Sequence, residues 1–345
     1  MCRAQTYFHA GEGAEAGAGA AGIPPQSVAV IIATRNEKPE LLLHTITSIF
    51  TNSGEELKAV VIVDDMSDSK VKDWPTWDPQ SSPEAHKLHT LMEQKCAGGN
   101  VKQCLRFVRP KKRLGVAGAK DFGAHIFSVA QGKDHFHDNT VSTLVFLDGH
   151  VVVSPQWLAP LVHTLSLNPT AVAYPALDVI DPASGGFVKA GNVVGGFSWA
   201  LDFRWEDASN ASRLPSFSSS SETGTGTGTG TGSEDDVLLS PAAPGIFAIK
   251  TSYYTRLDGL DTNLKPYGLE NIELSLRVWR CGGSVLRQPC SRVAHMYRNV
   301  FQVAAASAGN AVSQQDVDRN VMLVAGTCAN VGLVCVSMYV YMCAV

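Results

Sequence analysis

The sequence predicts an α/β fold in which a Rossmann-like, mostly parallel central sheet carries helices on both faces. Short apolar runs of buried-strand length alternate with stretches of helical periodicity. Two of these runs end in aspartates, at Asp64-Asp65 and at Asp148. Such alternation is typical of a doubly wound sheet, whose ligands bind beyond the carboxyl ends of the strands. With 345 residues, the chain is long enough to hold one large domain of this kind.

The N-terminal part of the chain can bury little surface. Residues 1–26 include a Gly- and Ala-rich stretch at 11–22, which is typical of a linker. No apolar run of signal or anchor length is visible there. We therefore expect a flexible N-terminal segment without a targeting signal, followed by a folded domain over residues 27–305.

The first strand, helix and strand of that domain follow in order. The apolar run Val28-Ala-Val-Ile-Ile-Ala33 has the length of a buried strand. Pro39 stands where a helix can begin, and apolar side chains then recur at helical spacing. A second strand is expected over residues 60–63, so that Asp64-Asp65 stands at its carboxyl end.

The next elements continue the alternation after a polar interval. Residues 68–100 contain several X-Pro pairs and are expected to be mostly loop with one short helix. A strand is expected over 105–108 and a helix over 115–130. A further strand over 143–147 then places Asp148 at its carboxyl end, at the same edge as the earlier aspartates.

Two later segments differ from the rest in composition. Residues 206–239 are rich in Ser, Gly and Thr and include a Thr-Gly repeat, so a flexible insert loop is expected there. Residues 306–345 are expected to form a helical, apolar tail. Within the tail, 321–345 contains no charged side chain and is long enough to cross a bilayer, which allows either membrane contact or a buried terminal helix.

The residues after the fourth strand suggest a metal site. Side chains two positions apart in a strand project to the same side, so Asp148 and His150 can face one ion, while Gly149 leaves room for a ligand. A carboxylate with an imidazole suits Mn²⁺ or Zn²⁺ better than Ca²⁺. A turn aspartate followed by an unrelated histidine gives the same pattern, so residues elsewhere must decide.

Acidic and aromatic side chains in the second half add to this pattern. Glu270-Asn-Ile-Glu273 opens an apolar-periodic stretch and places two carboxylates in the first turn of a helix. Tyr267 precedes it beside a glycine, where an exposed ring can stack on a sugar or base. Helix-dipole complementarity for the carboxylates and a buried position for the tyrosine are the alternative explanations.

A histidine and an arginine follow a short strand expected over residues 284–287. His295 can complete a metal site with Asp148 and His150, and Arg298 can neutralise a phosphate. A divalent ion is what a sugar nucleotide requires, because the departing diphosphate carries concentrated negative charge. Each residue can equally lie at an ordinary surface position.

Bulk properties exclude several other classes. The formal charge of −4 offers no polyanion-binding surface, so nucleic acid is not an expected partner. The eight cysteines include no CxxC pair, which argues against a zinc ribbon or a thioredoxin-type redox site.

The order of motifs resembles the catalytic domain of the polypeptide N-acetylgalactosaminyltransferases from about Val28 to Arg298. The motifs that carry the resemblance are Asn36-Glu37, Val63-Asp64-Asp65, Arg113-Leu-Gly115, Phe146-Leu-Asp-Gly-His150 with Trp157-Leu158, Gly195-Gly-Phe-Ser-Trp199 with Phe203-Arg-Trp205, Gly245-Ile-Phe247, Glu270-Asn-Ile-Glu273, Trp279-Arg-Cys-Gly-Gly283, and Cys290-Ser-Arg-Val-Ala-His295 with Arg298.

The resemblance implies a glycosyltransferase A-type fold and an activity. A retaining transferase of this family moves GalNAc from UDP-GalNAc to Ser or Thr hydroxyls of a polypeptide with Mn²⁺, which initiates mucin-type O-glycosylation. The residues implied are the metal ligands Asp148, His150 and His295; the catalytic pair Glu270 and Asn271; and the substrate-binding residues Ala33, Asp65, Arg113, Gly149, Gly245, Tyr267 and Arg298. In this family Glu270 would serve in positioning and charge stabilisation.

The chain departs from the family pattern around the donor sugar. Tyr267 stands in place of a tryptophan, and Leu269 in place of a glycine. Ala33 occupies a position where a hydroxyl residue often contacts the nucleotide. Pro244 replaces the first glycine of a pair and removes a backbone donor. A related retaining transferase with another UDP-sugar or acceptor, or a nucleotide-binding pseudoenzyme, therefore stays open beside the first hypothesis.

The resemblance also implies a location and a disulfide. Family members act in the Golgi lumen or at its membrane, and Cys290 matches a family disulfide cysteine for which Cys2 is a conceivable partner. No ricin-type lectin domain is visible, so acceptor recognition is expected to rest on the catalytic domain. An inverting, processive transferase is disfavoured, since it would leave His295 unexplained.

Overall fold

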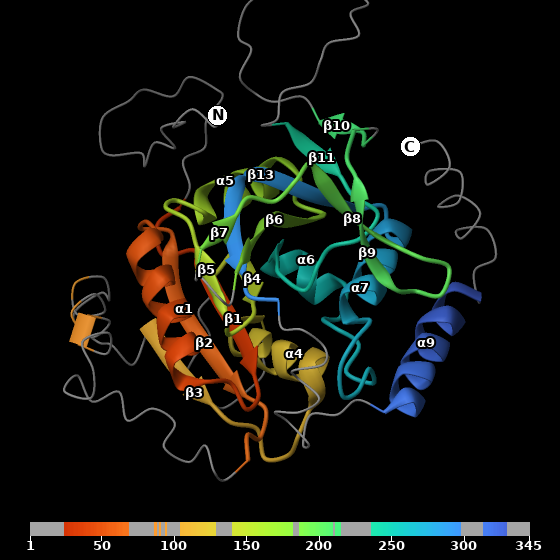
Figure 1. The fold of residues 1–345 in the computed structure, drawn as a ribbon, viewed down its shortest axis with the longest axis horizontal. Helices are drawn as coiled ribbons and strands as arrows, with labels where there is room; N and C mark the ends of the chain where they lie inside the picture. Colours follow the sequence, from red (N-terminus) through yellow and green to blue (C-terminus); the bar gives the residue numbers. More distant parts are fainter. Residues whose placement is uncertain are drawn as a thin grey trace, which may run out of the picture.

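A computed structural model of the chain describes residues 24–68, 104–128, 140–181, 186–209, 211–214, 236–297 and 313–329, with a few residues between 86 and 94. Figure 1 shows a central sheet with helices on both of its faces. The strands are β1 Val28–Thr34, β2 Leu57–Asp64, β3 Leu105–Val108, β4 Thr143–Leu147, β5 Val151–Val153, β6 Ala171–Ile180, β7 Phe187–Val188, β8 Val193–Phe197, β9 Phe203–Asp207, β10 Arg213–Leu214, β11 Val237–Leu239, β12 Phe247–Lys250 and β13 Ser284–His295. The helices are α1 Pro39–Asn52, α4 Gly115–Ser128, α5 Leu158–Leu167, α6 Thr251–Arg256, α7 Glu270–Arg280 and α9 Gln314–Ala329.

The strand order fixes where the chain can build a site. The central sheet runs β10-β11-β13-β6-β12-β4-β1-β2-β3, with β5 paired to β13 and β7 to β6. β1 is parallel to β2 and β4, and β2 is parallel to β3. β12 is antiparallel to both β4 and β6, and β13 is parallel to β6. Strands β1, β4, β6 and β13 therefore all point toward the same edge.

Two apolar cores hold the helices against the sheet. α1 and α5 pack with the sheet residues of one face, where Phe50 and Trp157 are fully buried. α4, α6 and α7 pack on the opposite face around Phe146 and Tyr254, whose ring centroids lie 5.5 Å apart. Figure 1 shows α1 and α5 on one side of β1 and α4 and α7 on the other. The predicted fold class is confirmed.

Most predicted elements occur where the periodicity placed them. The strands at 28–33, 60–63, 105–108 and 143–147 and the helix that begins at Pro39 are present, each within a few residues of its predicted bounds. The strand predicted over 284–287 was too short, because β13 continues to His295 through a register shift between Gln288 and Arg292. The region predicted as a loop over 68–100 lies almost wholly outside the described residues.

The predicted insert loop was too long at both ends. Strands β9 and β10 occupy residues 203–207 and 213–214, and β11 begins at Val237, so that ordered strands enter the predicted 206–239 segment from either side. Composition alone predicted too long a loop, because short strands contain Ser and acidic residues as readily as loops do. Residues 215–235, which hold the Thr-Gly repeat, lie outside the described residues.

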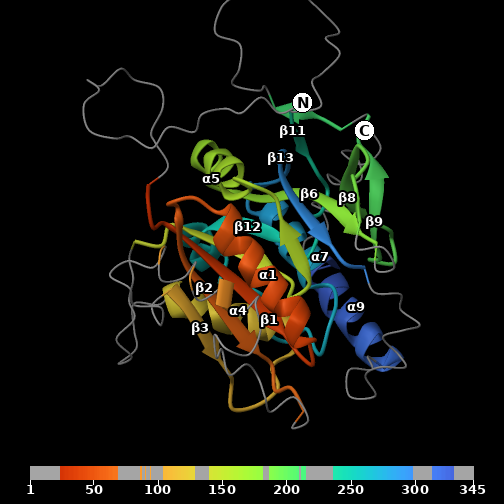
Figure 2. The same cartoon turned by 60° about the vertical axis from the view of Figure 1, so that its left-hand side comes forward.

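The C-terminal helix α9 lies beside α7 in both views (Figures 1 and 2). Its Val324 is buried in the same core as α7. Within the described part of the chain, each helix is too short or too polar to span a bilayer. Residues 330–345, which carry most of the uncharged stretch, lie outside the described residues, and so does the predicted flexible segment before Pro24.

Candidate metal and donor site

Strands whose ends meet at one edge bring the predicted metal ligands together. Asp148 follows β4 directly, and His295 is the last residue of β13, which points toward the same edge. β5 begins at Val151 and pairs antiparallel with β13, so that His295 stands opposite Val151. The Met296 backbone N–H then donates to the His150 carbonyl at 3.2 Å. Residues 147 positions apart in the chain thus become neighbours.

The three side chains form a compact cluster. One ligand atom from each of Asp148, His150 and His295 lies within 4.8 Å of the others. His295 Nε2 is 3.1 Å from Asp148 Oδ2, and the two imidazole centroids are 4.9 Å apart. A carboxylate and two imidazoles are a donor set that suits Mn²⁺ or Zn²⁺. The predicted set of three ligands can hold one metal ion.

A carboxylate behind the cluster fixes the orientation of His150. Glu37 Oε2 is 2.8 Å from His150 Nδ1, and the Glu37 side chain is only 5% exposed. With Nδ1 held by Glu37, Nε2 is the nitrogen that can face an ion, which is the usual carboxylate–histidine–metal arrangement. A Cβ added at Gly149 would lie 3.3 Å from Glu37 Cγ, so a side chain here would press on the carboxylate that holds His150, while the predicted ligand contact of Gly149 stays a prediction.

Helix α1 secures the turn that carries these residues. The hydroxyl of Thr45, which is fully buried, donates to the Gly149 carbonyl at 3.0 Å and accepts from the Val151 N–H at 3.0 Å. Backbone groups on both sides of His150 are therefore held by one side chain. A turn satisfied in this way loses little freedom when a ligand binds.

The electrostatics of the cluster favour an ionised Asp148. Burial opposes ionisation, but the hydrogen bond from His295 and the positive charges of Lys120 and the histidines outweigh it, so the pKa of Asp148 lies well below its usual value. The carboxylate is thus available as an anionic ligand over the whole physiological range.

A second group of predicted residues lies near Asp148. Glu270 opens α7 and is buried. Its Oε1 is 3.4 Å from the ammonium of Lys120, and the same ammonium donates to the Gly245 carbonyl at 3.0 Å. Glu270 and Gly245, which the sequence placed at the donor, are therefore joined by a residue that sequence reasoning missed.

The Asn271 side chain contacts the chain just before Gly245. Its Nδ2 donates to the Ala243 carbonyl at 2.9 Å, and Ser275 accepts from the Ala243 N–H at 2.9 Å. Side chains of helix α7 thus hydrogen-bond both the N–H and the carbonyl of Ala243, next to Pro244. The conformation of Ala243-Pro244-Gly245 is set by two elements that are remote in sequence.

A loop before α7 presents Tyr267 to the site. The Tyr267 side chain is 61% exposed. Partial desolvation of its hydroxyl and the negative charges of Glu270 and Asp148 raise the pKa of Tyr267 above its usual value. Gly268 and Leu269 have φ of 97° and 71°, so Leu269 stands in the left-handed region that favours glycine.

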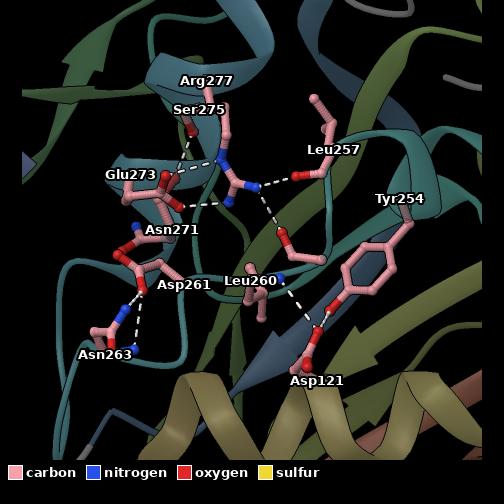
Figure 3. A network of polar contacts seen from close by, with 11 residues as sticks. Asp121, Tyr254, Leu257, Leu260, Asp261, Asn263, Asn271, Glu273, Ser275 and Arg277 are labelled. Carbon is pink, nitrogen blue, oxygen red and sulfur yellow. Dashed lines mark hydrogen bonds and ion pairs between the residues drawn. The ribbon is translucent and has the colours of Figure 1, made fainter. Parts of the chain in front are cut away.

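Helix α7 is anchored by a polar network at its back, shown in Figure 3. Arg277 makes a bidentate ion pair with Glu273, at 2.6 and 2.8 Å, and donates to the carbonyls of Leu257 and Gly259. Glu273 is therefore committed to Arg277. Of the two carboxylates in the first turn, Glu270 alone lies at the candidate site.

Only some of the residues predicted to bind the nucleotide part of the donor are brought together by the fold. Asp65 uses both carboxylate oxygens on backbone N–H groups at the start of α4, Leu114 at 2.6 Å and Gly115 at 2.9 Å. Asp65 therefore positions the Arg113 loop, and Arg113 itself is exposed. Ala33 stands at the carboxyl end of β1. Arg298 lies outside the described residues, so its predicted phosphate contact stays a prediction.

Comparison with known proteins places these observations in a family. A model of the N-terminal domain of galactosyltransferase matches residues 240–299, the span that contains Gly245, Glu270 and His295. Polypeptide N-acetylgalactosaminyltransferase 3 of Drosophila melanogaster is 32% identical over 283 residues, which cover 81% of this chain and 36% of the fly protein. The human transferase 14 is 32% identical over 278 residues, covering 80% of this chain and 41% of its own length. The chain belongs to the polypeptide N-acetylgalactosaminyltransferase family.

One relative in this family has a different description. The mouse inactive polypeptide N-acetylgalactosaminyltransferase-like protein 5 is 32% identical over 301 residues, covering 86% of this chain and 58% of the mouse protein.

Among solved structures, a crystal structure of GalNAc-T7 with UDP, GalNAc and Mn²⁺ matches with a TM-score of 0.58 and 24% identity, over 80% of this chain and 45% of that one. The fold is thus that of a glycosyltransferase A-type domain. This chain spans roughly two fifths of the length of the two named transferases above.

Among the described cysteines, Cys104 is disulfide-bonded, whereas Cys281 and Cys290 are not. Cys281 carries a free thiol at the surface, and Cys290 keeps its thiol in a half-buried position. Cys2, the conceivable partner of Cys290, lies outside the described residues. The family disulfide therefore stays a prediction.

Proposed function

We propose that this chain is a retaining glycosyltransferase that moves GalNAc from UDP-GalNAc to Ser or Thr hydroxyls of polypeptides with Mn²⁺. The observation that carries the proposal is one sheet edge at which Asp148, His150 and His295 form a three-ligand cluster beside Glu270. The same edge holds Gly245 and Tyr267, which suit contact with a sugar. By family, the protein would act in the Golgi lumen or at its membrane.

The donor set fits the proposed ion. Glu37 holds His150 Nδ1, so Nε2 can face an ion, and Asp148 stays ionised. Asp148, His150 and His295 would hold Mn²⁺, which when bound neutralises the negative charge of a diphosphate leaving group.

The remaining roles belong to side chains of this chain. Glu270 is proposed to orient the donor sugar and to stabilise the positive charge that develops at its anomeric carbon. Asn271 would keep the Ala243 backbone, and with it Gly245, in position against the sugar. Tyr267 would stack on the sugar, since it is largely exposed in the loop that leads into Glu270 at the start of α7.

A donor-panel assay tests the proposal. Purified chain, Mn²⁺ and Ser/Thr-containing peptides are incubated with UDP-GalNAc, UDP-GlcNAc, UDP-galactose and UDP-glucose, and glycopeptide is measured by mass spectrometry. We expect transfer from UDP-GalNAc that falls at least about a hundredfold in His150→Ala. The exposed His44 on α1 provides the control variant, His44→Ala, which should keep full activity. Transfer from a different UDP-sugar alone would replace the donor assignment.

A nucleotide-binding pseudoenzyme is the second candidate, favoured by the equal identity to the mouse protein described as inactive. The departures at Tyr267, Leu269 and Pro244 fall around the sugar and leave the three metal ligands intact. Calorimetric titration of UDP with and without Mn²⁺ separates the candidates when it is paired with the donor panel. Metal-dependent UDP binding together with no transfer from any donor would favour the pseudoenzyme.

A further inference from the structure

Lys120 is a buried cation at the base of the candidate site. Its side chain is 2% exposed, although it lies in the middle of α4. Lysine is almost never buried to this degree unless it is paired, because removing an ammonium from water costs several kcal/mol. Its ammonium has two partners that the proposed function already uses, the Glu270 carboxylate at 3.4 Å and the Gly245 carbonyl at 3.0 Å.

Stability alone does not explain this pair. A buried ion pair is often no more stabilising than apolar side chains of the same volume, since desolvation offsets the attraction. Several other side chains of α4 are buried and apolar, namely Ala117, Ala119, Ala124 and Phe127. An apolar residue at position 120 would match these neighbours but would leave Glu270 buried without a cation.

Three segments meet at this ammonium. Lys120 comes from α4, Gly245 precedes β12, and Glu270 is the first residue of α7. The Ala243 backbone is held from the other side by Asn271 and Ser275. Lys120 is also close enough to Asp148 to help keep its carboxylate ionised. The ammonium therefore joins α4 to the two segments that carry Gly245 and Glu270.

We propose that Lys120 is a positioning residue that holds the Glu270 carboxylate and the Gly245 carbonyl in the geometry that receives the donor sugar. The inference rests on the proposed function, because it assigns Glu270 and Gly245 to the sugar end of a UDP-sugar. Lys120 acts through these two groups, so its contribution belongs to the sugar and not to the UDP part of the donor.

Comparing UDP with UDP-GalNAc tests this role without requiring turnover. Calorimetric titration with Mn²⁺ present measures both ligands on wild type, Lys120→Met and Lys120→Arg. We expect Lys120→Met to bind UDP-GalNAc about tenfold more weakly and UDP within about twofold of wild type. Lys120→Arg keeps the charge but not the compact ammonium, so it should show a smaller loss that is again confined to UDP-GalNAc.

A matched control lies at the opposite edge of the sheet. Lys250 ends β12 opposite Thr143, the first residue of β4, and is partly buried. Lys250→Met removes a less deeply buried lysine far from Asp148 and should leave both affinities unchanged. Thermal melting of each variant confirms folding. If Lys120→Met does not fold, Lys120→Arg carries the test, and unchanged UDP-GalNAc binding in that variant would overturn the role.

A double-mutant cycle shows whether Lys120 works through Glu270. If it does, Lys120→Met added to Glu270→Gln should weaken UDP-GalNAc binding by less than threefold, since the partner carboxylate is already neutral. Full additivity of the two losses would contradict the inference, and so would equal weakening of UDP and UDP-GalNAc. A wild-type chain that binds neither ligand would overturn the proposed function and this inference together, whereas the other outcomes concern Lys120 alone.

Discussion

Glu37 determines how His150 is presented to an ion. Its carboxylate is 2.8 Å from His150 Nδ1, and both side chains are largely buried. An imidazole held on one nitrogen has a fixed ring orientation and a fixed tautomer, which raises its basicity toward a metal at the other nitrogen. The candidate metal site is therefore a set of three ligands with a supporting carboxylate that comes from the loop just before α1.

Replacing Glu37 should weaken metal binding while the ligands stay in place. Glu37→Gln keeps the shape but removes the charge, so we expect about 10- to 100-fold weaker Mn²⁺ binding, measured by electron paramagnetic resonance of free Mn²⁺. Glu40→Gln, at an exposed position one turn along, is the control. Equal affinities of wild type and Glu37→Gln would mean that Glu37 does not support the site.

Single residues were predictable from the sequence to different degrees. Asp148, His150 and His295 could be named because they belong to motifs in a recognisable order. The role of Glu37 could not be assigned, since its contact with His150 spans 113 positions and depends on the fold. Lys120 gave no signal, because a lysine within a helix normally lies at the surface. Asp65 matched a family residue, but only the structure shows its two backbone hydrogen bonds.

Strand β13 shows why element boundaries were harder to predict than element types. The periodic stretch ends at Arg287, and Pro289 lacks the N–H that a continuing strand would use. The structure accommodates the proline with a register shift between Gln288 and Arg292 and then resumes pairing with β6. This continuation carries His295 to the edge where Asp148 stands. Without it the third metal ligand would be out of reach.

Helix α9 fixes the loop that presents Tyr267. Asn320 is 1% exposed; its Oδ1 accepts from the Lys265 N–H at 3.3 Å and its Nδ2 donates to the Tyr267 carbonyl at 3.2 Å. Arg319 donates to the Lys265 carbonyl. One amide side chain thus satisfies backbone groups two residues apart, a contact that could not be predicted from the residue pattern.

Removing that amide should loosen the loop locally. Asn320→Ala removes two hydrogen bonds to the backbone of this loop, so we expect a loss of about 1–3 kcal/mol in the free energy of unfolding and faster hydrogen exchange over residues 265–269. Val324→Ala, on the same helix but in the apolar core, should destabilise the chain without a selective change in that loop. Equal exchange rates in the two variants would contradict the role of Asn320.

At the scale of the whole molecule, the site depends on strands that end at one edge. β1, β4 and β13 all point toward that edge, so Ala33, Asp148 and His295 converge although they are far apart in sequence. The parallel half was predictable from the alternation of apolar runs and helices. The antiparallel β12 between β4 and β6 was not, since its direction depends on pairing and leaves no mark in a short apolar run.

A pH-dependent contribution to the free energy of unfolding is expected where α4 meets the loop after α6. The hydrogen bond to Asp121, only partly opposed by burial, raises the pKa of His125 to about 9, and the charge of Asp258 adds to the effect. Asp121 also accepts from the hydroxyl of Tyr254 at 2.8 Å (Figure 3). The folded-state pKa of His125 lies above the unfolded value of about 6.5. The stabilisation by the His125–Asp121 pair is therefore fully present below about pH 6.5 and is lost as the pH rises through about 9.

The measurement is chemical denaturation at a series of pH values between about 6 and 10. Since the His125 side chain is 51% exposed, solvent screening should limit its share to under about 1 kcal/mol. His125→Gln should therefore lose less stability than wild type over this range, whereas His44→Gln, at an exposed position on α1, should follow the wild-type curve. Parallel curves for wild type and His125→Gln would show that the Asp121 pair adds nothing to folding, and would assign the pH dependence to other groups.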